Sequence, residues 1–491
     1  MKGDTGLLGE ITHIGKWWSP DNPSENIYGI LKFKHDHIRL ELSGVFTKKY
    51  ISQRLRLETM HGLTNEGQKI TLYQVSELYF SARLPTESES KNNFGESVFS
   101  CKYIFVGRHF NHAEDIIFNH LGMNFTYLDK WIDNKLEYKW DGDVHNIKTK
   151  SIDYELNLES ICSTLQILSR PMNLGDYRTD IRILYRSGML IKPCEAKNWK
   201  WFHEIINNLK NLLTLLIGYP VYPTHLSAEP IDGSNFDIIE IYYCQPNPLI
   251  IEDFQPWHIG IAFPDMLKYA NRNVQKIAEV INNWFDKIEI IGPVFDLFFL
   301  TFYDLSMSDR TCFLTLMQAI ETFHRRVHLD EKYLDDDEYE HVRKTLLNAI
   351  PEELEPDFKK SLKGGLKYGN ELSLQSRLEK LQKVGPDKLK WFDMIMRDEK
   401  GIIYKLVATR NYYTHFSETS PKNTISEADL PAINYKLRLF LRILLLEQIN
   451  SKGILSNFNV ISPFLEKLKY DKEESQFLQQ KENDPTRIDL P

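Results

Sequence analysis

Three side chains near residue 410 have the chemistry needed to cleave a phosphodiester. They are Arg410, Asn411 and His415, which fall within about one and a half turns of a segment predicted to be helical. Arginine can hold a phosphate through two hydrogen bonds and can stabilise the added charge of a five-coordinate transition state. Histidine titrates near neutral pH and can transfer a proton. Because RNA supplies its own ribose hydroxyl as the nucleophile, this set predicts RNA cleavage that needs neither a metal nor a protein nucleophile.

The predicted helix gives Arg410 an unusual environment. Ile403 and Leu406 lie on its apolar face, and Arg410 continues that face seven residues after Ile403. Since burying a guanidinium costs desolvation energy, Arg410 requires an acidic partner or a ligand anion. Asn411 and His415 are four residues apart and share a neighbouring face. We expect the long Arg410 side chain to reach the same pocket as His415. The alternative on this local pattern is a cation at the C-terminus of a helix together with a surface histidine.

A second cluster of polar residues lies on an earlier predicted helix. Glu321, His324 and His328 share one face, and two histidines four residues apart can bind a metal. The H-E-x-x-H protease pattern is absent, however, because no glutamate follows the first histidine. An ion pair between Glu321 and Arg325 is the simpler interpretation. A further alternative is that Glu321 helps to position Arg410.

The composition of the chain is globular, and its net charge is acidic. Hydrophobic residues make up 42% of the 491 residues, which is enough for more than one core. The formal charge of −8 gives no overall attraction to nucleic acid or anionic lipid, so binding of RNA would need local basic residues. The basic residues near the motif that could supply this local field are Arg397, Lys405, Lys422, Arg438 and Arg442.

The cysteines and the hydropathy indicate a soluble cytoplasmic protein. The five cysteines are Cys101, Cys162, Cys194, Cys244 and Cys312, which are far apart and show no C-x-x-C spacing. This pattern disfavours a zinc cage or a disulfide framework and is typical of a reducing compartment. The N-terminus has no apolar signal core, and no apolar run is long enough for a membrane helix. We therefore expect no cofactor and no contact with a membrane.

The first half of the chain predicts β-structure. Between residues 29 and 42, apolar residues alternate with charged ones, which is typical of a sheet with one solvated face, and residues 35–37 form a corner. Further predicted strands span residues 69–80, 98–106, 152–158, 180–185 and 236–243.

The second half of the chain switches to helical periodicity. Amphipathic helices are predicted from residue 201 to Gly218 and around residues 274–288, 313–320 and 430–444. The acidic run at residues 335–338 is interpreted as a solvated face. The fold class is therefore α+β, with a β-rich domain followed by a helical one. We expect a β-rich domain over residues 1–190, an α+β linking region over 191–304, a helical domain over 305–455 and a partly flexible extension over 456–491.

Several of these segments resemble a family of anti-phage defence proteins. Residues 17–23 (WWSPDNP), 28–33 (YGILKF) and 38–44 (IRLELSG) are similar to the N-terminal domain of ApeA-like proteins. Residues 313–321 (FLTLMQAIE) and 376–381 (SRLEKL) resemble their HEPN domain, and Arg410 to His415 resembles the Arg-x(4–6)-His signature of HEPN ribonucleases. Together these stretches reach across most of the chain.

The resemblance implies a function and a role for each signature residue. HEPN domains are helical bundles that commonly form dimers, and active members cut RNA without metal, typically leaving a cyclic phosphate. ApeA-like proteins act in abortive defence, so a homodimer, an RNA substrate and a phage-derived trigger are the expected partners. Arg410 would bind the scissile phosphate, His415 would transfer the proton and Asn411 would orient one of them. Glu321 would support the site, and Lys405, Arg438 and Arg442 would attract the RNA.

Two alternatives remain open on the sequence. The helical domain could be a catalytically silent module for dimerisation or RNA binding that acts through partner contacts. A metal-dependent hydrolase that uses His324 and His328 is the other alternative. Transfer RNA is a plausible substrate because nucleases that arrest growth often cut it.

Overall fold

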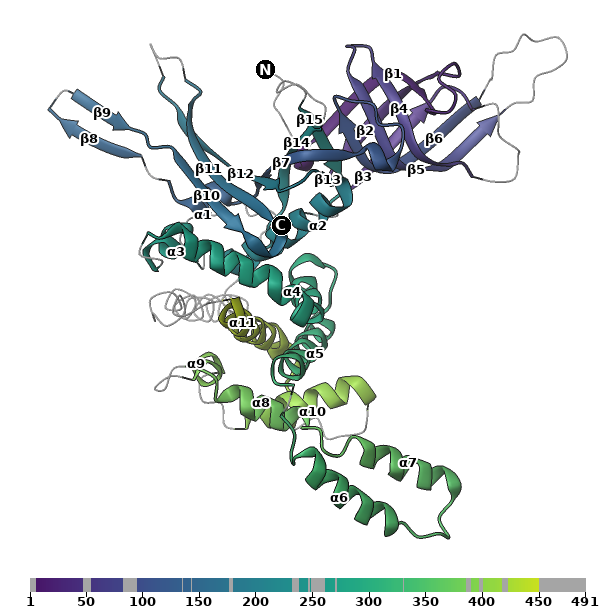
Figure 1. The fold of residues 1–491 in the computed structure, drawn as a ribbon, viewed down its shortest axis with the longest axis vertical. Helices are drawn as coiled ribbons and strands as arrows, with labels where there is room; N and C mark the ends of the chain where they lie inside the picture. The colour runs from purple at the N-terminus through teal and green to yellow at the C-terminus, as the bar shows by residue number, and fades with distance from the viewer. Residues whose placement is uncertain are drawn as a thin grey trace, which may run out of the picture. The chain divides into compact units, whose positions relative to one another are not determined.

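The computed structural model divides the chain into two compact units, Met1–Phe285 and Asp286–Asn450. The residues that it describes are 6–46, 54–82, 95–134, 136–142, 144–175, 180–231, 238–245, 248, 261–269, 272–329, 331–385, 390–396, 401–416 and 423–449. The first unit contains the strands, and the second contains helices (Figure 1). The predicted fold class, a β-rich N-terminal part followed by a helical one, is confirmed.

The first part of the β-rich unit is a closed antiparallel barrel. Its strands, joined in the order β6-β3-β2-β1-β4-β5 with β5 returning to β6, are β1 (Glu10–Trp18), β2 (Ile27–Lys34), β3 (His37–Leu42), β4 (Arg56–Thr64), β5 (Lys69–Ala82) and β6 (Gly95–Val106). The predicted alternation is visible in β2 and β3, because Leu31 pairs with Leu40 and both side chains are buried. Trp17 is fully buried, and its indole N–H donates to the Gly29 carbonyl at 3.3 Å.

The sheet continues from the barrel through β6. Its further strands, in the order β15-β14-β7-β12-β11-β10 with β13 on β7, are β7 (Ile117–Phe125), β10 (Ile152–Leu158), β11 (Ser163–Asn173), β12 (Ile183–Pro193), β13 (Lys197–Asn198), β14 (Pro223–Pro230) and β15 (Ile239–Tyr243). A separate hairpin pairs β8 (Glu137–Asp141) with β9 (Val144–Lys148). Since β14 and β15 belong to the same sheet, the β-rich unit continues past residue 190.

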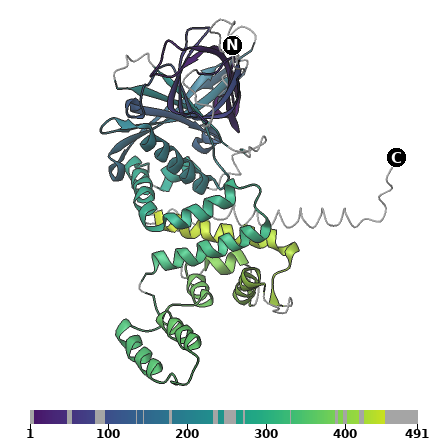
Figure 2. The ribbon, with the colours of Figure 1, turned by 90° about the vertical axis from the view of Figure 1, so that its right-hand side faces the viewer.

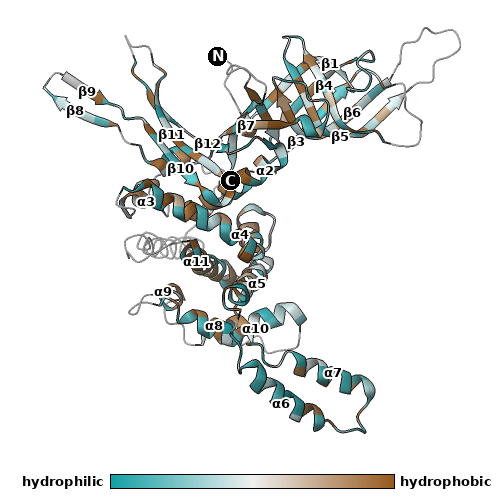
Figure 3. Cartoon of the chain, viewed as in Figure 1, coloured by the Kyte–Doolittle hydropathy of each residue, from teal (hydrophilic) through white to brown (hydrophobic). Residues whose placement is uncertain are grey.

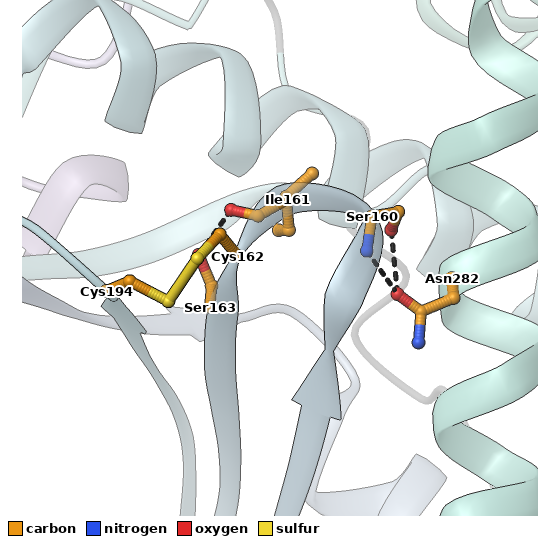
Figure 4. The surroundings of a disulfide bond; sticks show 6 residues. All are labelled: Ser160, Ile161, Cys162, Ser163, Cys194 and Asn282. Carbon is orange, nitrogen blue, oxygen red and sulfur yellow. Dashed lines mark hydrogen bonds between the residues drawn. A yellow bond between two sulfur atoms is a disulfide. The ribbon is translucent and has the colours of Figure 1, made fainter.

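A disulfide bond joins two of the cysteines (Figure 4). Cys162 and Cys194 are 32 residues apart in sequence, but their Cα atoms lie 5.6 Å apart. The reason is the register of β11 and β12, which pairs Ser163 with Pro193. Cys162 directly precedes Ser163 and Cys194 directly follows Pro193, so this pairing brings the two cysteines side by side. The prediction that spacing disfavours disulfides was therefore wrong for this pair, because the spacing alone does not reveal strand pairing.

In the described part of the first unit, helices accompany the sheet. They are α1 (Leu128–Ile132), α2 (Trp199–Ile217) and α3 (Phe263–Tyr269). The predicted end of α2 is confirmed, because Gly218 adopts the left-handed conformation with φ of 90° that favours glycine at a helix C-terminus. At the other end, Asn198 caps the helix by accepting the backbone N–H of Trp201 at 3.0 Å.

The division between the two units falls inside α4 (Val274–Tyr303). This helix continues beyond the predicted stretch of residues 274–288 in spite of Pro293. Proline cannot donate a backbone hydrogen bond, and the chain accommodates it by leaving helical geometry at Ile291, where φ is −115°.

The helical unit is centred on α5 and α11. The further helices are α5 (Asp309–Val327), α6 (Asp336–Asn348), α7 (Pro356–Lys367), α8 (Leu374–Gln382), α9 (Trp391–Met396), α10 (Ile402–His415) and α11 (Leu430–Ile449). α11 packs along α5 (Figure 2), and Asn434 on α11 donates to the Asp309 carbonyl at 2.9 Å. α10 packs on both α5 and α8, so α5 contacts the signature helix as well as the core.

The helices α6 and α7 form a hairpin that packs on itself. Neither helix contains a buried residue, and both are largely hydrophilic (Figure 3). Asp336, Asp337 and Glu338 occupy the first turn of α6, where negative charge interacts favourably with the helix dipole. The acidic run is therefore a solvated face, as predicted.

Candidate active site

The signature helix α10 is fixed by apolar and polar contacts. It begins after Gly401, whose φ is 74°, and ends before Phe416, whose φ is 45°. The hydroxyl of Thr409 on its buried face donates to the Lys405 carbonyl at 2.7 Å and accepts the backbone N–H of Ile425 at 2.8 Å. The helix is thus bonded to the segment that leads into α11.

Arg410 has an acidic partner on α5. Its Nη2 atom lies 3.7 Å from Oε2 of Glu321, and its Nη1 atom donates to Oδ1 of Asn411 at 3.1 Å. The side chains of Arg410 and Glu321 are 34% and 20% exposed. The guanidinium is therefore held at the end of the apolar face but remains accessible to a ligand anion.

Glu321 belongs to a chain of alternating charges. Arg325 pairs with Glu321 at 3.2 Å and also with Glu371, which lies just before α8. The hydrogen bond from Arg325 lowers the pKa of Glu371, and the same bond raises the pKa of Arg325. These pairs restrain the Glu321 carboxylate, and this carboxylate in turn restrains Arg410. The Glu321–Arg325 pair was predicted from sequence, whereas Glu371 was missed because no local pattern marks a partner 46 residues from Arg325.

His415 lies at the last position of α10 and is exposed. It follows Arg410 by five positions, so the two side chains leave the helix axis in directions about 140° apart. Among the described residues, His415 makes no hydrogen bond or ion pair with Arg410. Asn411 is only about 40° from His415 around the helix and is also exposed. One chain thus joins Arg410, Asn411 and Glu321, but it does not bring the imidazole to the guanidinium.

The histidines of α5 are part of a buried polar cluster. The Arg377 guanidinium donates to Nδ1 of His324 at 3.0 Å, so the imidazole proton resides on Nε2. Nε2 lies 3.3 Å from Oε2 of Glu331 but without hydrogen-bond geometry. Burial is the main cause that lowers the pKa of His324 to about 4. Within the described residues, no group of three or more His, Cys, Asp or Glu side chains is arranged to hold a metal.

The basic residues expected near RNA lie in different surroundings. Lys405 is exposed on α10. Arg438 donates to the hydroxyl and the carbonyl of Thr301, each at 3.1 Å, and Arg442 is only 5% exposed, with its pKa lowered by burial to about 9. α11 packs into the core, so Arg442 is buried there and Arg438 is held against Thr301, and the expected contact of these two residues with RNA stays a prediction. Arg397 and Lys422 lie outside the described residues.

Two aromatic side chains, one on α10 and one directly after it, were not anticipated from the sequence. Tyr404 is 55% exposed, and Phe416, just after the helix, is 68% exposed. Tyr404 precedes Asn411 by seven residues and His415 by eleven, so helical spacing places these three side chains on one face. The same spacing rule applied to the sequence could have identified this exposed face.

Comparison with known protein families assigns both units. The family model for ApeA N-terminal domain 1 matches residues 12–284, which is more than half of the chain, and the model for the ApeA-like HEPN domain matches residues 314–452. The chain belongs to the ApeA-like family. No curated protein and no solved structure matches it.

Membership of this family suggests an anti-phage nuclease role for the ApeA-like chain. The HEPN match includes most of α5 and all of α10 and α11, so Glu321, Arg410 and His415 lie within it. Within the described residues, no helix of this ApeA-like protein combines the length and the apolar character needed to span a bilayer.

Proposed function

We propose that the chain is a metal-independent endoribonuclease of the HEPN type that acts in anti-phage defence, and that two copies form its active site. The observation that carries this proposal is the separation of the signature residues. Arg410 is restrained by Glu321 at 3.7 Å, whereas His415 is exposed on another side of α10. A second copy with its α10 facing the first would bring the His415 of one chain to the Arg410 of the other.

The exposed face of α10 is suited to such a contact. Tyr404, Asn411 and His415 lie on this face, and Phe416 follows at its end. Exposed aromatic rings of this kind are typical of the centres of interfaces, where they contribute most of the binding free energy. The contact would bury Tyr404 and would leave the polar residues of the signature around a shared cleft.

The cleavage step follows from the properties of these side chains. The Arg410 guanidinium would bind the scissile phosphate, since a pair at 3.7 Å is longer than a charge-assisted hydrogen bond of about 2.8 Å and is readily exchanged for a phosphate. His415 accepts the proton of the ribose 2′-hydroxyl. At the same time the ribose 2′-oxygen bonds to phosphorus, and the bond from phosphorus to O5′ breaks. The proton then passes to O5′, which leaves a 2′,3′-cyclic phosphate and a 5′-hydroxyl.

Asn411 and Glu321 have supporting roles in this scheme. The Asn411 amide oxygen accepts a hydrogen bond from Arg410 at 3.1 Å and so fixes the direction of the guanidinium. Glu321 orients the same group from α5. Orientation of this kind contributes to catalysis because a misplacement of about 1 Å can lower the rate about a hundredfold. We propose transfer RNA as the substrate, because its cleavage would arrest growth when a phage-derived trigger releases the enzyme.

The test of this function is the mapping of cleaved RNA ends in cells that express the parent chain or His415→Ala. The parent should produce ends with cyclic phosphates and arrest growth, and His415→Ala should do neither while it still folds and forms dimers. His341→Ala is the matched control, because His341 is an exposed histidine on α6 of the same unit. Equal RNA cleavage by the parent and His415→Ala would refute the proposed chemistry.

A second function remains a candidate because the His415 side chain makes no hydrogen bond or ion pair with the described part of its own chain, while Tyr404 and Phe416 are exposed. In this alternative, the HEPN unit is a silent module for dimerisation or RNA binding, and defence depends on partner contacts. The same variants separate the two functions. Full protection of cells by His415→Ala, with no RNA cleavage from the parent, would favour the silent module.

A further inference from the structure

The β-rich unit contains a cavity that has no part in the proposed cleavage. Its volume is about 640 Å³, which lies within the range of about 300–1,000 Å³ that is typical of small-molecule sites. Strands β5 and β6, the short helical turn Ala113–Asp115 and the first turns of α2 contribute its lining. All of these elements belong to Met1–Phe285, so the cavity is complete within one unit.

Two polar atoms of the lining are buried without a partner. The Trp199 side chain belongs to a residue that is only 3% exposed, and its indole Nε1 has no hydrogen-bond partner among the described residues. Nδ1 of His203, one helical turn further along α2, is also a buried atom with no hydrogen-bond partner among the described residues. The two rings have centroids 5.7 Å apart. Because unpaired buried polar groups are unfavourable, this pair indicates a ligand with polar atoms on its edge.

The remaining walls of the cavity are largely aromatic. Tyr73 and Tyr103 stack with ring centroids 5.9 Å apart, and Tyr103 contacts Trp199 edge to face at 5.3 Å. Burial raises the pKa of Tyr103, and the Trp199 indole N–H opposes this shift because it lies near the Tyr103 hydroxyl, although without hydrogen-bond geometry. Burial also lowers the pKa of His203, so its imidazole is neutral at pH 7 and Nδ1 can donate or accept. Flat rings and neutral polar groups are suited to a flat heteroaromatic ligand.

The charges around the cavity restrict the class of ligand further. Glu114 and Glu204 contribute two negative charges to the lining, whereas Lys200 contributes one positive charge. A net negative lining disfavours phosphate groups. A purely hydrocarbon ring, such as a phenylalanine side chain, would leave both Trp199 Nε1 and His203 Nδ1 unpaired.

The backbone at the cavity shows local strain. Gln74 on β5 lines the cavity and has φ of 56°, which is in the left-handed region that residues other than glycine rarely adopt. Strain of this kind often occurs at ligand sites, because a surrounding structure that is built for binding holds the residue in place.

We propose that this cavity binds a neutral heteroaromatic group of nucleobase size, as in a free nucleoside. The indole N–H of Trp199 donates to an acceptor on the edge of the base, and Nδ1 of His203 bonds to a second polar atom. The rings of Tyr73 and Tyr103 contact the flat part of the ligand. The site would give the N-terminal unit a small-molecule ligand, and it is independent of the cleavage proposed for α10.

The experiment is calorimetric titration of the full-length protein with adenosine and guanosine. At least one nucleoside should bind with one-to-one stoichiometry, and its 5′-monophosphate should bind at least fivefold more weakly. Trp199→Phe retains a ring but removes the N–H, so it should weaken binding about tenfold. The control is Trp201→Phe, because Trp201 packs against Phe202 and does not line the cavity, and it should bind the nucleoside as the parent does.

A charge reversal keeps the test informative if Trp199→Phe fails to fold. Glu114 is exposed at the edge of the cavity, and Glu114→Lys should bring the affinity for the monophosphate up to that for the nucleoside. His415→Ala should bind the nucleoside normally, so this test does not depend on the nuclease. The proposal is overturned if neither nucleoside binds below millimolar concentration, or if Trp199→Phe has no effect on affinity.

Discussion

Replacement of Glu321 by glutamine tests whether α5 positions the catalytic arginine. The Glu321 carboxylate contacts Arg410 at 3.7 Å and Arg325 at 3.2 Å, and Glu321→Gln keeps the size of the side chain while removing its charge. Both pairs are partly exposed, and pairs of this kind contribute about 0.2–1 kcal/mol each to stability. We therefore expect the free energy of unfolding to fall by about 1 kcal/mol and the fold to remain intact.

The effect of Glu321→Gln on catalysis should be larger than its effect on binding. Arg410 would keep its hydrogen bond to Asn411 but would lose the ion pair with Glu321 that orients it from α5. We therefore expect kcat to fall about tenfold, which corresponds to a rise of about 1.4 kcal/mol in the activation free energy. The KM for RNA should not rise, because the removed carboxylate competes with phosphate for the guanidinium. The assay is the cleavage of purified total transfer RNA at several concentrations.

Glu371→Gln is the matched control for this prediction. Glu371 pairs with Arg325 but does not contact Arg410, so its replacement should cost similar stability with a much smaller loss of kcat. Equal loss of kcat in the two variants would mean that Glu321 acts only through general stability. An unchanged kcat in Glu321→Gln would refute the positioning of Arg410 by α5.

Three further predictions concern assembly and stability. Tyr404→Glu places a charge on the exposed face of α10 and should raise the dissociation constant of the dimer at least tenfold in sedimentation experiments. Tyr368→Glu, at an exposed residue directly after α7, should leave this constant unchanged. The pKa of His324 is about 4 in the folded protein and 6.5 in the unfolded chain. The folded protein therefore keeps its full stability above pH 6.5 and loses stability as the pH falls toward 4, because the unfolded chain takes up the proton first. Denaturant titration should show a loss of up to roughly 3 kcal/mol in the free energy of unfolding, and His324→Gln should make this loss smaller. Because the Cys162–Cys194 bond closes a loop of 32 residues, Cys162→Ser should lower the free energy of unfolding of the β-rich unit by about 2–4 kcal/mol in denaturant titration. Cys244→Ser, at a partly buried free cysteine of the same unit, should lower it much less.

Local periodicity predicted the helices and strands that bury their apolar side chains on one face. The hairpin of β2 and β3 was predicted because Leu31, Phe33 and Leu40 alternate with charged residues. The strands β7 and β14 were missed, because Gly122 interrupts the apolar pattern of one and prolines stand at both ends of the other. Their pairing is specified by neighbours far away in sequence, and a local pattern carries no information about such neighbours.

The candidate site was predictable in its chemistry but not in its geometry. The sequence indicated that Arg410 requires an anion, which follows from the cost of burying a guanidinium, and it offered Glu321 as one alternative partner. The second link of the charge chain, from Arg325 to Glu371, depends on how α8 packs against α5 and has no local signal. The separation of His415 from Arg410 follows from helix geometry, because two side chains five positions apart on an α-helix point in directions about 140° apart.

The most direct test of the shared active site combines two inactive variants in one dimer. Arg410→Ala and His415→Ala should each be inactive alone. If the His415 of one chain acts with the Arg410 of the other, a mixed dimer retains one complete site, so purified heterodimers should cleave RNA at about half the rate of the parent. Heterodimers that form normally but cleave no RNA would contradict the shared site.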